Sequence, residues 1–308
     1  MDPLTPSSPR EGAGDVDPSD PEAVLELFAR VCARTAAIVA ANDDWDGSGR
    51  RDGQYSVDLT VDDACLEMLH GAGLRVLSEE SGVTERDVVG DVVVGGDAGG
   101  VGEFVAGGGG PDAGGAGAGG ARHRDGYEVR DPRSGAIVVV DPLDGSTNAA
   151  LGLPWCATSL CLVVDGVPEV ATVANLRTGA MFTAVRSQGA RLDGNPIRVS
   201  PPMPLSVAVI AVNARPPDGF RPAQFRAMGA TALDIASVAA GGFDGSIDFD
   251  DDRIGVWDYL AGTLIVTEAG GVVADARGRD LVTLDPRQRR RPVTATHVGL
   301  LDELLAHG

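Results

Sequence analysis

Apolar residues recur at helical spacing in two segments near the beginning of the chain. Asp20 is a residue type that caps helices, Pro21 suits the first helical position, and an apolar stripe follows them. This pattern predicts an amphipathic helix that ends near Ala41. The same spacing predicts a second helix over residues 59–71, and a short strand, LRVLSEE, that ends at two acidic residues.

The middle of the chain changes from helical periodicity to the patterns of strands. Five apolar, mostly β-branched residues at 136–140 predict a strand that is buried on both faces. Residues 156–200 predict an antiparallel meander, because apolar segments alternate there with DG, RTG and DGNP turns. Further on, the sequence predicts a strand at VAVIAVN, helices over 232–240 and 257–269, and a strand at VVADA.

Composition limits where this structure can form. Of the 308 residues, 43% are apolar but only 4% are aromatic, so the core must consist mainly of Val, Leu, Ile and Ala. Residues 1–20 are rich in Pro, Ser, Asp and Gly, which predicts a disordered N-terminal tail. The glycine-rich stretch that follows the first acidic cluster predicts a disordered insertion at about 84–128, because such a sequence loses too much chain entropy to pack.

Charge and cysteine usage exclude several classes of protein. The formal net charge of −20 disfavours nucleic acid and anionic membranes as partners. The four cysteines form no C-x-x-C pair and are expected to be small core residues. The N-terminus lacks the basic and apolar regions of a signal peptide, and no run of 18 apolar residues occurs. We therefore expect a soluble, cytoplasmic protein.

Three acidic clusters follow or begin predicted elements. Glu79 and Glu80 end a strand, Asp141 and Asp144 end the buried strand, and Asp258 begins a helix. Each alone has an ordinary explanation, respectively a solvated pair, a turn or calcium loop, and a helix cap. Together they predict a site where carboxylates converge, which requires a cation or a proton between them. Hard oxygen ligands without His or Cys favour magnesium, manganese or calcium over zinc.

A possible anion site follows directly in the sequence. Gly145 permits a tight turn, and Ser146 and Thr147 can begin a helix there. The free amides at a helix N-terminus are suited to binding phosphate. A phosphate ester bound to so acidic a protein needs positive charge nearby, which a bound metal ion supplies.

These motifs resemble a known family. SEESG (78–82), VVVDPLDGSTN (138–148) and WDYLAGTLIVTEAGG (257–271), supported by GNPIRVS and ALDIASVAAGGFDG, are similar to motifs of the inositol monophosphatase family of lithium-sensitive, magnesium-dependent phosphatases. The resemblance implies a layered αβαβα sandwich of the inositol monophosphatase/fructose-1,6-bisphosphatase type. It implies one domain over 21–308, with an N-terminal α+β half at about 21–200 and a C-terminal α/β half at about 201–308.

The resemblance also implies a set of metal ligands. Glu79, Asp141 and the carbonyl of Leu143 would hold a first Mg²⁺. Asp141 would be shared with a second ion, which Asp144 and Asp258 also hold. Family members can take up a third ion near Glu79, so two or three Mg²⁺ ions are expected.

Catalytic and substrate residues follow from the same resemblance. Asp62 would orient the hydroxyl of Ser146, and these two residues with Glu79 would help a metal-activated water to attack phosphorus. The phosphate would be bound by Asp144, Gly145, Ser146 and Thr147, and a substrate hydroxyl by Asp248 or Asp251.

The function implied is hydrolysis of inositol monophosphate or a similar small polyol or sugar phosphate. Within the same fold, fructose-1,6-bisphosphatase, nucleotide 3′-phosphatase and histidinol-phosphatase activities are alternatives. A non-catalytic, metal-binding regulatory relic is an alternative of another class. A calcium-binding module is disfavoured, because the acids are spread over roughly 180 residues rather than one loop. The expected partner is a small phosphate ester, and the family is often homodimeric.

Overall fold

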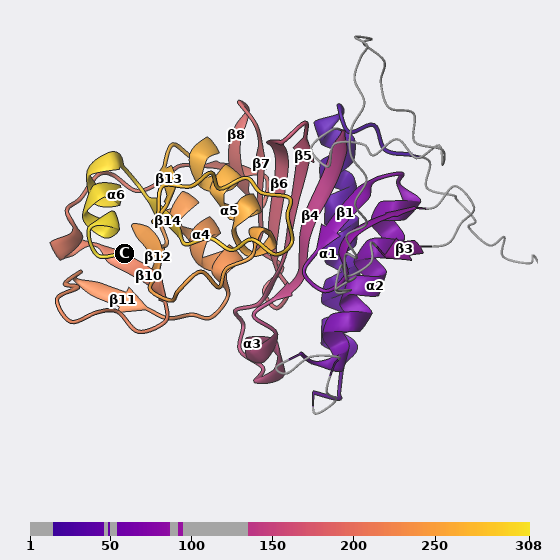
Figure 1. Ribbon diagram of the computed structural model, residues 1–308, viewed down its shortest axis with the longest axis horizontal. Helices are drawn as coiled ribbons and strands as arrows, with labels where there is room; N and C mark the ends of the chain where they lie inside the picture. The colour runs from indigo at the N-terminus through magenta and orange to yellow at the C-terminus, as the bar shows by residue number, and fades with distance from the viewer. Residues whose placement is uncertain (1–14, 46–48, 50–53, 87–91, 95–134) are drawn as a thin grey trace, which may run out of the picture.

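The protein is built of alternating layers of helices and sheets. The computed structural model describes residues 15–45, 49, 54–86, 92–94 and 135–308. Helices α1 and α2 cover the outer face of a large sheet, α4 and α5 lie between that sheet and a smaller one, and α6 packs on the far face of the smaller sheet (Figure 1). This arrangement confirms the predicted αβαβα sandwich.

The two N-terminal helices begin at strong local signals. Helix α1 spans Pro21–Ala41, as predicted, and the Asp20 carboxylate accepts hydrogen bonds from the amides of Glu22 and Ala23 at its first turn. Helix α2 spans Ser56–Gly71 and begins three residues earlier than predicted. The Asp58 carboxylate accepts a hydrogen bond from the amide of Tyr55 at 2.8 Å, which fixes this earlier start.

In the described part of the chain, the large sheet has nine strands in the order β3-β2-β1-β4-β5-β6-β7-β8-β9. Strand β1 runs parallel to β4, and the other neighbours are antiparallel. The strands are β1 (Arg75–Ser78), β2 (Gly82–Arg86), β3 (Val92–Val94), β4 (Ala136–Asp144), β5 (Ala157–Val164), β6 (Val167–Asn175), β7 (Met181–Val185), β8 (Gly189–Leu192) and β9 (Asn195–Ile197).

Strand β4 is buried on both faces, as its run of apolar residues predicts. Ile137 and Val139 pack in the cluster that includes α4 and α5, whereas Val138 and Val140 pack in the cluster beneath α1 and α2. Successive residues of a strand point to opposite faces, so an uninterrupted apolar run suits a strand between two helical layers. The end of β4 is therefore fixed inside the molecule.

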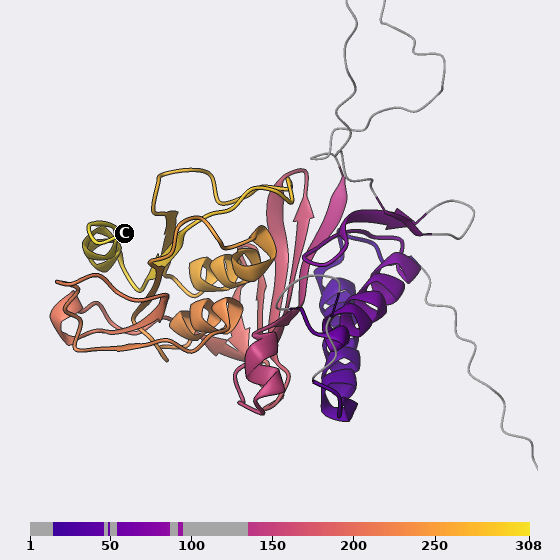
Figure 2. The same ribbon diagram turned by 60° about the horizontal axis from the view of Figure 1, so that its bottom comes forward.

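The smaller sheet has the order β11-β10-β12-β14-β13, again within the described residues. Strands β10, β11 and β12 are parallel, and β14 is antiparallel to both of its neighbours. The two central helices lie side by side next to it (Figure 2). The remaining elements are α3 (Ser146–Ala150), η1 (Leu205–Val207), β10 (Val209–Asn213), β11 (Gln224–Arg226), α4 (Thr231–Ala239), β12 (Gly245–Asp248), α5 (Val256–Glu268), β13 (Val272–Asp275), β14 (Pro292–Ala295) and α6 (Val298–Leu305).

Both segments predicted to be disordered overlap with ordered chain. The tail was expected over 1–20, but Val16 donates a backbone hydrogen bond to Ala72 at 2.9 Å. The insertion was expected over about 84–128, but β2 and β3 continue the sheet within that range. Strand β2 pairs with β1 and β3 pairs with β2, and this backbone pairing stabilises both strands although their sequence gives little sign of it. The rest of the two predicted segments, residues 1–14, 87–91 and 95–128, lies outside the described residues.

Two simpler predictions also have outcomes in the structure. All four cysteines are free and buried, as expected for core residues. None of the helices in the described ranges is both long and apolar enough to cross a membrane.

Candidate metal centre

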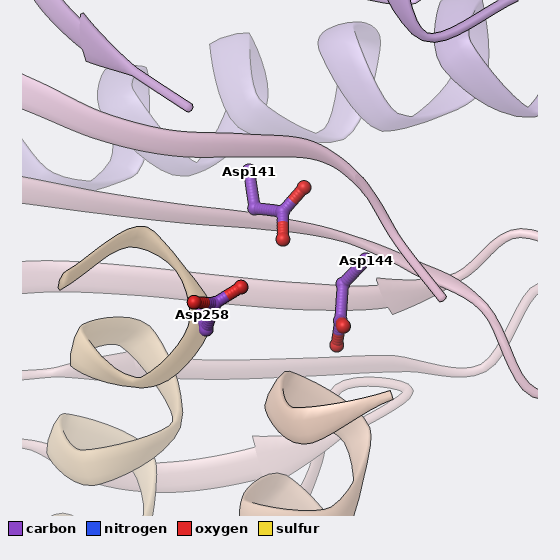
Figure 3. Close-up of side chains that lie close together, drawn as sticks. All are labelled: Asp141, Asp144 and Asp258. Carbon is purple, nitrogen blue, oxygen red and sulfur yellow. The ribbon is translucent and has the colours of Figure 1, made fainter. Parts of the chain in front are cut away.

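Three aspartates from distant parts of the chain point toward one another where the large sheet meets the central helices (Figure 3). Asp141 and Asp144 lie at the end of β4, and Asp258 lies in the first turn of α5. Each offers a carboxylate oxygen, and these oxygens all lie within 4.8 Å of one another. The structure thus brings together the two acidic clusters that the sequence separates by more than 100 residues.

An irregularity at the end of β4 turns Asp141 and Asp144 to the same side. In a regular strand, residues three apart point to opposite faces. Here the pairing register with β5 shifts between the two aspartates, as at a β-bulge, which changes the direction of the second side chain. The carbonyl of Pro142 accepts a hydrogen bond from Thr158 Oγ1 at 2.8 Å, and Asp141 Oδ1 accepts one from the Leu143 amide at 3.0 Å.

The beginning of α4 holds Asp144 in place. Its two carboxylate oxygens accept hydrogen bonds from the amides of Thr231 at 3.2 Å and Ala232 at 2.7 Å. These amides have no partner within the helix, and the positive end of the helix dipole favours an ionised carboxylate there. Asp144 therefore connects the end of the large sheet to the layer of central helices.

Asp258 is held by the loop that leads into α5. Its Oδ2 atom accepts a hydrogen bond from the amide of Gly255 at 2.6 Å. A Cβ atom on Gly255 would lie 2.4 Å from the ring of Trp257, so only glycine fits beneath this ring. The loop sequence G-V-W-D thus packs the indole against the backbone and directs the next residue toward the other carboxylates.

Glu79 approaches the same cluster from the turn after β1. Its amide donates a hydrogen bond to the carbonyl of Val140 on β4. Burial, together with the charges of Asp258 and Glu80, raises the pKa of Glu79 to about 8, and a hydrogen bond with Asp141 opposes part of this rise. Glu79 is therefore close enough to interact with both Asp141 and Asp258.

Asp62 supports that turn from α2. Its two carboxylate oxygens accept hydrogen bonds from the hydroxyls of Ser78 and Ser81, which flank Glu79 and Glu80. A carboxylate can accept more than two hydrogen bonds, so the expected pairing of Asp62 with Ser146 stays a prediction.

Burial and mutual repulsion make it energetically costly for these carboxyl groups to be ionised without a cation among them. Burial and the charges of Glu79 and Asp144 raise the pKa of Asp141 well above its ordinary value. Burial raises the pKa of Asp144 to about 8, although the α4 amides oppose the shift. Burial and the Asp144 charge raise the pKa of Asp258 to about 7. Converging buried carboxylates with no His or Cys among them have the chemistry of a site for hard divalent cations.

The predicted phosphate site follows the cluster without interruption. Gly145 has a φ of +81°, and α3 begins at Ser146, so the amides of the first turn have no partner within the helix. Figure 2 shows this short helix at the end of the long strand β4. Ser146 is partly buried and Thr147 is exposed.

Gly145 is required by both its backbone conformation and its surroundings. A Cβ atom there would lie 2.9 Å from the carbonyl oxygen of Trp155 and 3.0 Å from the Ala230 side chain. We predict that Gly145→Ala lowers the free energy of unfolding by about 3 kcal/mol, from left-handed strain plus overpacking. Gly152→Ala is the matched control, because Gly152 has a φ of +72° with open space around it, and should cost only about 1 kcal/mol. Urea unfolding measures both; equal losses would contradict the steric explanation.

The structure separates the two acids expected to bind a substrate hydroxyl. Asp248 ends β12, is buried, and its Oδ2 atom has no hydrogen-bond partner among the described residues. Asp251 has a side chain that is 92% exposed and pairs with Arg277 at 3.2 Å. Of the two, only Asp248 faces the interior.

Two charged residues near the centre were not predicted from the sequence. Asp234 on α4 is buried, accepts a hydrogen bond from Trp155 Nε1 at 2.9 Å, and has a pKa that burial raises to about 7. A single acid within the apolar run ALDIASVAA was the available signal. Arg289 lies over the ring of Trp257, 5.0 Å from its centre, and no local pattern predicts that contact.

Several known proteins are related to this chain in sequence. A model of the inositol monophosphatase family matches residues 114–307. The Nus factor SuhB of Escherichia coli strain K12 is 38% identical over 154 residues, which are 46% of this chain and 57% of that protein. The inositol monophosphatase of Mesembryanthemum crystallinum is 36% identical over 157 residues, with the same two shares. The chain thus matches little more than half the length of these curated relatives.

Solved structures agree with the fold over most of the chain. The extragenic suppressor protein suhB from Bartonella henselae superposes with a TM-score of 0.67 at 23% identity, covering 92% of this chain and 98% of that one. Inositol monophosphatase from Anabaena gives a TM-score of 0.65 at 21% identity, covering 93% and 95%. These similarities establish the layered architecture.

Proposed function

This chain belongs to the inositol monophosphatase family, and we propose that it is a magnesium-dependent phosphomonoesterase that hydrolyses inositol monophosphate or a similar small polyol or sugar phosphate. The observation that carries the proposal is the convergence of Asp141, Asp144 and Asp258, with carboxylate oxygens within 4.8 Å of one another. Such a cluster needs compensating positive charge, and a phosphate ester needs the same charge to bind.

Two or three Mg²⁺ ions would be held by Glu79, Asp141, the Leu143 carbonyl, Asp144 and Asp258. When bound, the ions would supply positive charge for the phosphoryl oxygens and increase the acidity of water. The protein side chains hold the rest of the geometry. Glu79 takes up a proton from the attacking water, and the amides of Gly145, Ser146 and Thr147 bind phosphoryl oxygens. Asp248 accepts a hydrogen bond from a substrate hydroxyl.

The assay that tests this proposal measures phosphate release from a panel of esters with and without Mg²⁺. We expect turnover that depends on Mg²⁺ and is inhibited by lithium, with inositol monophosphate and hexose phosphates among the substrates. Sedimentation of the active protein tests the homodimer that we also propose. If no ester in the panel released phosphate, the proposed enzymatic activity would be refuted.

A regulatory role is the second candidate, because relatives at 38% identity carry the name Nus factor. In that case the acidic cluster would bind metal and stabilise the fold without catalysis. The two candidates differ in one measurement: Mg²⁺ would raise the melting temperature in both, but only the enzyme would release phosphate. Retention of Glu79, Asp141, Asp144 and Asp258 around one centre favours the enzyme.

Asp62 is expected to act by positioning the turn that carries Glu79. We predict that Asp62→Ala lowers kcat by about 10- to 100-fold, as loss of support behind a metal ligand commonly does. The two freed serine hydroxyls should also cost about 1–3 kcal/mol of stability. Asp63→Ala is the control, because Asp63 is the neighbouring, exposed residue of α2. Unchanged turnover in Asp62→Ala would show that the turn keeps its shape without this carboxylate.

A further inference from the structure

A row of arginines at residues 287–291 lies against the loop that leads into the candidate metal centre, and the proposed function does not use it. The amide of Arg290 donates a hydrogen bond to the carbonyl of Ile254 at 3.0 Å, forming an isolated β-bridge. Ile254 is four residues before Asp258. The basic segment is therefore attached to the backbone that presents one of the clustered carboxylates.

Most arginines of this region are neutralised by aspartates. Arg277 pairs with Asp251 and Asp252, Arg279 pairs with Asp252 and Asp275, and Arg287 pairs with Asp285. Within the described residues, Arg289, Arg290 and Arg291 form no such ion pair, and Arg291 Nη2 donates to the backbone carbonyl of Asp248. Their recorded hydrogen bonds go to backbone carbonyls and, for Arg290, to the side chain of Gln288. In a chain with a net charge of −20, three guanidinium groups without a carboxylate partner need an explanation, and two of them, Arg289 and Arg290, line one surface depression.

The two guanidinium groups differ in how many donors they use. Arg290 is buried, and its Nε, Nη1 and Nη2 atoms all donate, to Asp280, Arg289 and Gln288 respectively. Arg289 donates only from Nη1, to the carbonyls of Pro286 at 2.7 Å and Gln288 at 3.0 Å. Its Nε and Nη2 atoms have no partner among the described residues and are not buried. Arg289 therefore offers one complete edge to a ligand.

That edge is held rigidly. The Arg289 guanidinium lies 5.0 Å from the centre of the Trp257 ring, and the ring is itself packed on Gly255. Stacking and the two carbonyl contacts fix the plane of the guanidinium before any ligand arrives. The Nε–Nη2 edge of arginine matches two oxygens of a phosphate or carboxylate, which a lysine ammonium does not.

The position of Arg289 places it next to the reacting centre. Trp257, on which it lies, directly precedes Asp258. Arg289 also lines an open surface depression together with Arg279, Arg287, Gln288, Arg290 and Asp252. A group bound at this edge would lie over Trp257, on the loop that presents Asp258 to the carboxylate cluster.

We propose that Arg289 binds a second anionic group of the substrate, a phosphate or a carboxylate, while the phosphate to be cleaved lies at the cluster of Asp141, Asp144 and Asp258. This inference rests on the proposed function and narrows its substrate class. Inositol monophosphate carries only one anionic group, so the preferred substrate is a phosphate ester with two. Arg289 is then the residue that determines this specificity.

A purely structural role for Arg289 predicts something different. If it only clamps the 286–291 loop onto Trp257, its loss should affect all phosphate esters equally. If it only adds positive charge near Asp258, the loss should again be the same for every substrate. A change in the ratio between substrates that differ at one distant group distinguishes the proposal from both.

Three glucose derivatives isolate that distant group. Glucose 1-phosphate, glucose 1,6-bisphosphate and glucuronic acid 1-phosphate share the 1-phosphate and carry a hydroxyl, a phosphate or a carboxylate at C6. In wild type we expect higher kcat/KM for release of the 1-phosphate from at least one of the doubly anionic esters than from glucose 1-phosphate. Which of the two is preferred identifies the second group as phosphate or carboxylate.

The decisive variant is Arg289→Gln, with Arg287→Gln as the matched control. Arg287 lies in the same segment, but its side chain is 85% exposed and already paired with Asp285. Arg289→Gln should lower kcat/KM for the doubly anionic ester about 10- to 100-fold, mainly through KM, as expected for a lost charge-assisted contact. The value for glucose 1-phosphate should change less than about threefold, and Arg287→Gln should change both less than about threefold.

Equal losses for all three esters in Arg289→Gln would overturn the proposal, as would a wild type with no preference for a second anion. Arg289→Lys keeps the charge and covers the case in which the glutamine variant does not fold. It should lose the preference in part, because an ammonium cannot present a paired edge. A lysine variant with the full wild-type preference would contradict bidentate binding.

A binding measurement separates failure of this inference from failure of the proposed function. In metal-free protein, the acidic cluster repels anions, so calorimetric titration with inorganic phosphate reports on Arg289 rather than on catalysis. We expect millimolar binding in wild type and Arg287→Gln, and loss of it in Arg289→Gln. Absence of turnover with this binding intact would refute the phosphatase but keep the anion site. If the protein turns over substrate but Arg289→Gln leaves phosphate binding unaffected, the phosphatase would stand and the anion site at Arg289 would be refuted.

Discussion

Asp141→Asn is expected to lower kcat by at least about a thousandfold while leaving the fold intact. The charges of Glu79, Asp144 and Asp258 all act on Asp141. Asp141 is therefore the member of the cluster best placed to be shared between two cations. An asparagine has the same shape, and its carbonyl oxygen can still accept the hydrogen bond from the Leu143 amide. What it removes is the negative charge, which weakens cation binding at the centre where positive charge is needed.

The measurement for Asp141→Asn combines phosphate release with thermal unfolding of metal-free protein. Because one of several mutually repelling carboxylates is lost, the melting temperature at pH 8 should stay level or rise, which excludes misfolding as the cause of inactivity. Asp302→Asn, at an exposed position on α6, is the control and should keep full activity. Wild-type turnover in Asp141→Asn would show that the carboxylate cluster takes no part in the reaction.

The parts of the fold that could be predicted depend on local signals. The bounds of α1 follow from Asp20 and Pro21, which act within one helical turn. The two buried faces of β4 follow from its uninterrupted apolar run. In contrast, β11 was not predicted, because Gln224–Arg226 is exposed and pairs with β10 only through its backbone. Strands β2 and β3 were not predicted for a similar reason: β2 pairs with β1 and β3 with β2, and this backbone pairing outweighs their weak sequence pattern.

The candidate site shows the same division. Asp141 and Asp144 are close in sequence, and the pattern D-P-L-D at the end of a buried strand predicted that they converge. Which of Asp248 and Asp251 lies inward could not be predicted from sequence. It depends on Arg277, Arg279 and Asp275, which lie more than 20 residues further on and hold the acidic loop outward. Likewise, the contact of Arg289 with Trp257 joins residues 32 positions apart.

Mg²⁺ is expected to stabilise the protein strongly at pH 8 and weakly at pH 5. A buried carboxyl whose pKa is higher in the folded than in the unfolded chain binds its proton more tightly when folded. Its stabilising contribution is complete below the unfolded pKa near 4 and is lost as pH rises through the folded value. For Glu79 and Asp144 that value is about 8, and for Asp258 about 7. Metal-free protein should therefore lose stability progressively between pH 4 and 8.

Cations replace protons in this balance, so their effect must grow as the protons leave. At a hundredfold excess over its Kd, one bound ion adds about 2.7 kcal/mol, which is a shift on the order of 5 °C or more for a chain of this size. The measurement is the melting temperature with EDTA or Mg²⁺ across pH 5–8 at constant ionic strength. Asp141→Asn is the control and should show a much smaller Mg²⁺ effect at pH 8.

Asp234 allows the metal-dependent part of the pH effect on stability to be distinguished from the rest. Burial raises the pKa of Asp234 to about 7, so it also lowers stability as pH rises, but it is not among the proposed ligands. Asp234→Asn should reduce the pH dependence of the metal-free protein but keep a clear increment from Mg²⁺ at pH 8, which Asp141→Asn should largely lose. An increment from Mg²⁺ that is equal at pH 5 and pH 8 would mean that the cation binds somewhere other than these carboxylates, because carboxylates of ordinary pKa near 4 are already ionised at pH 5.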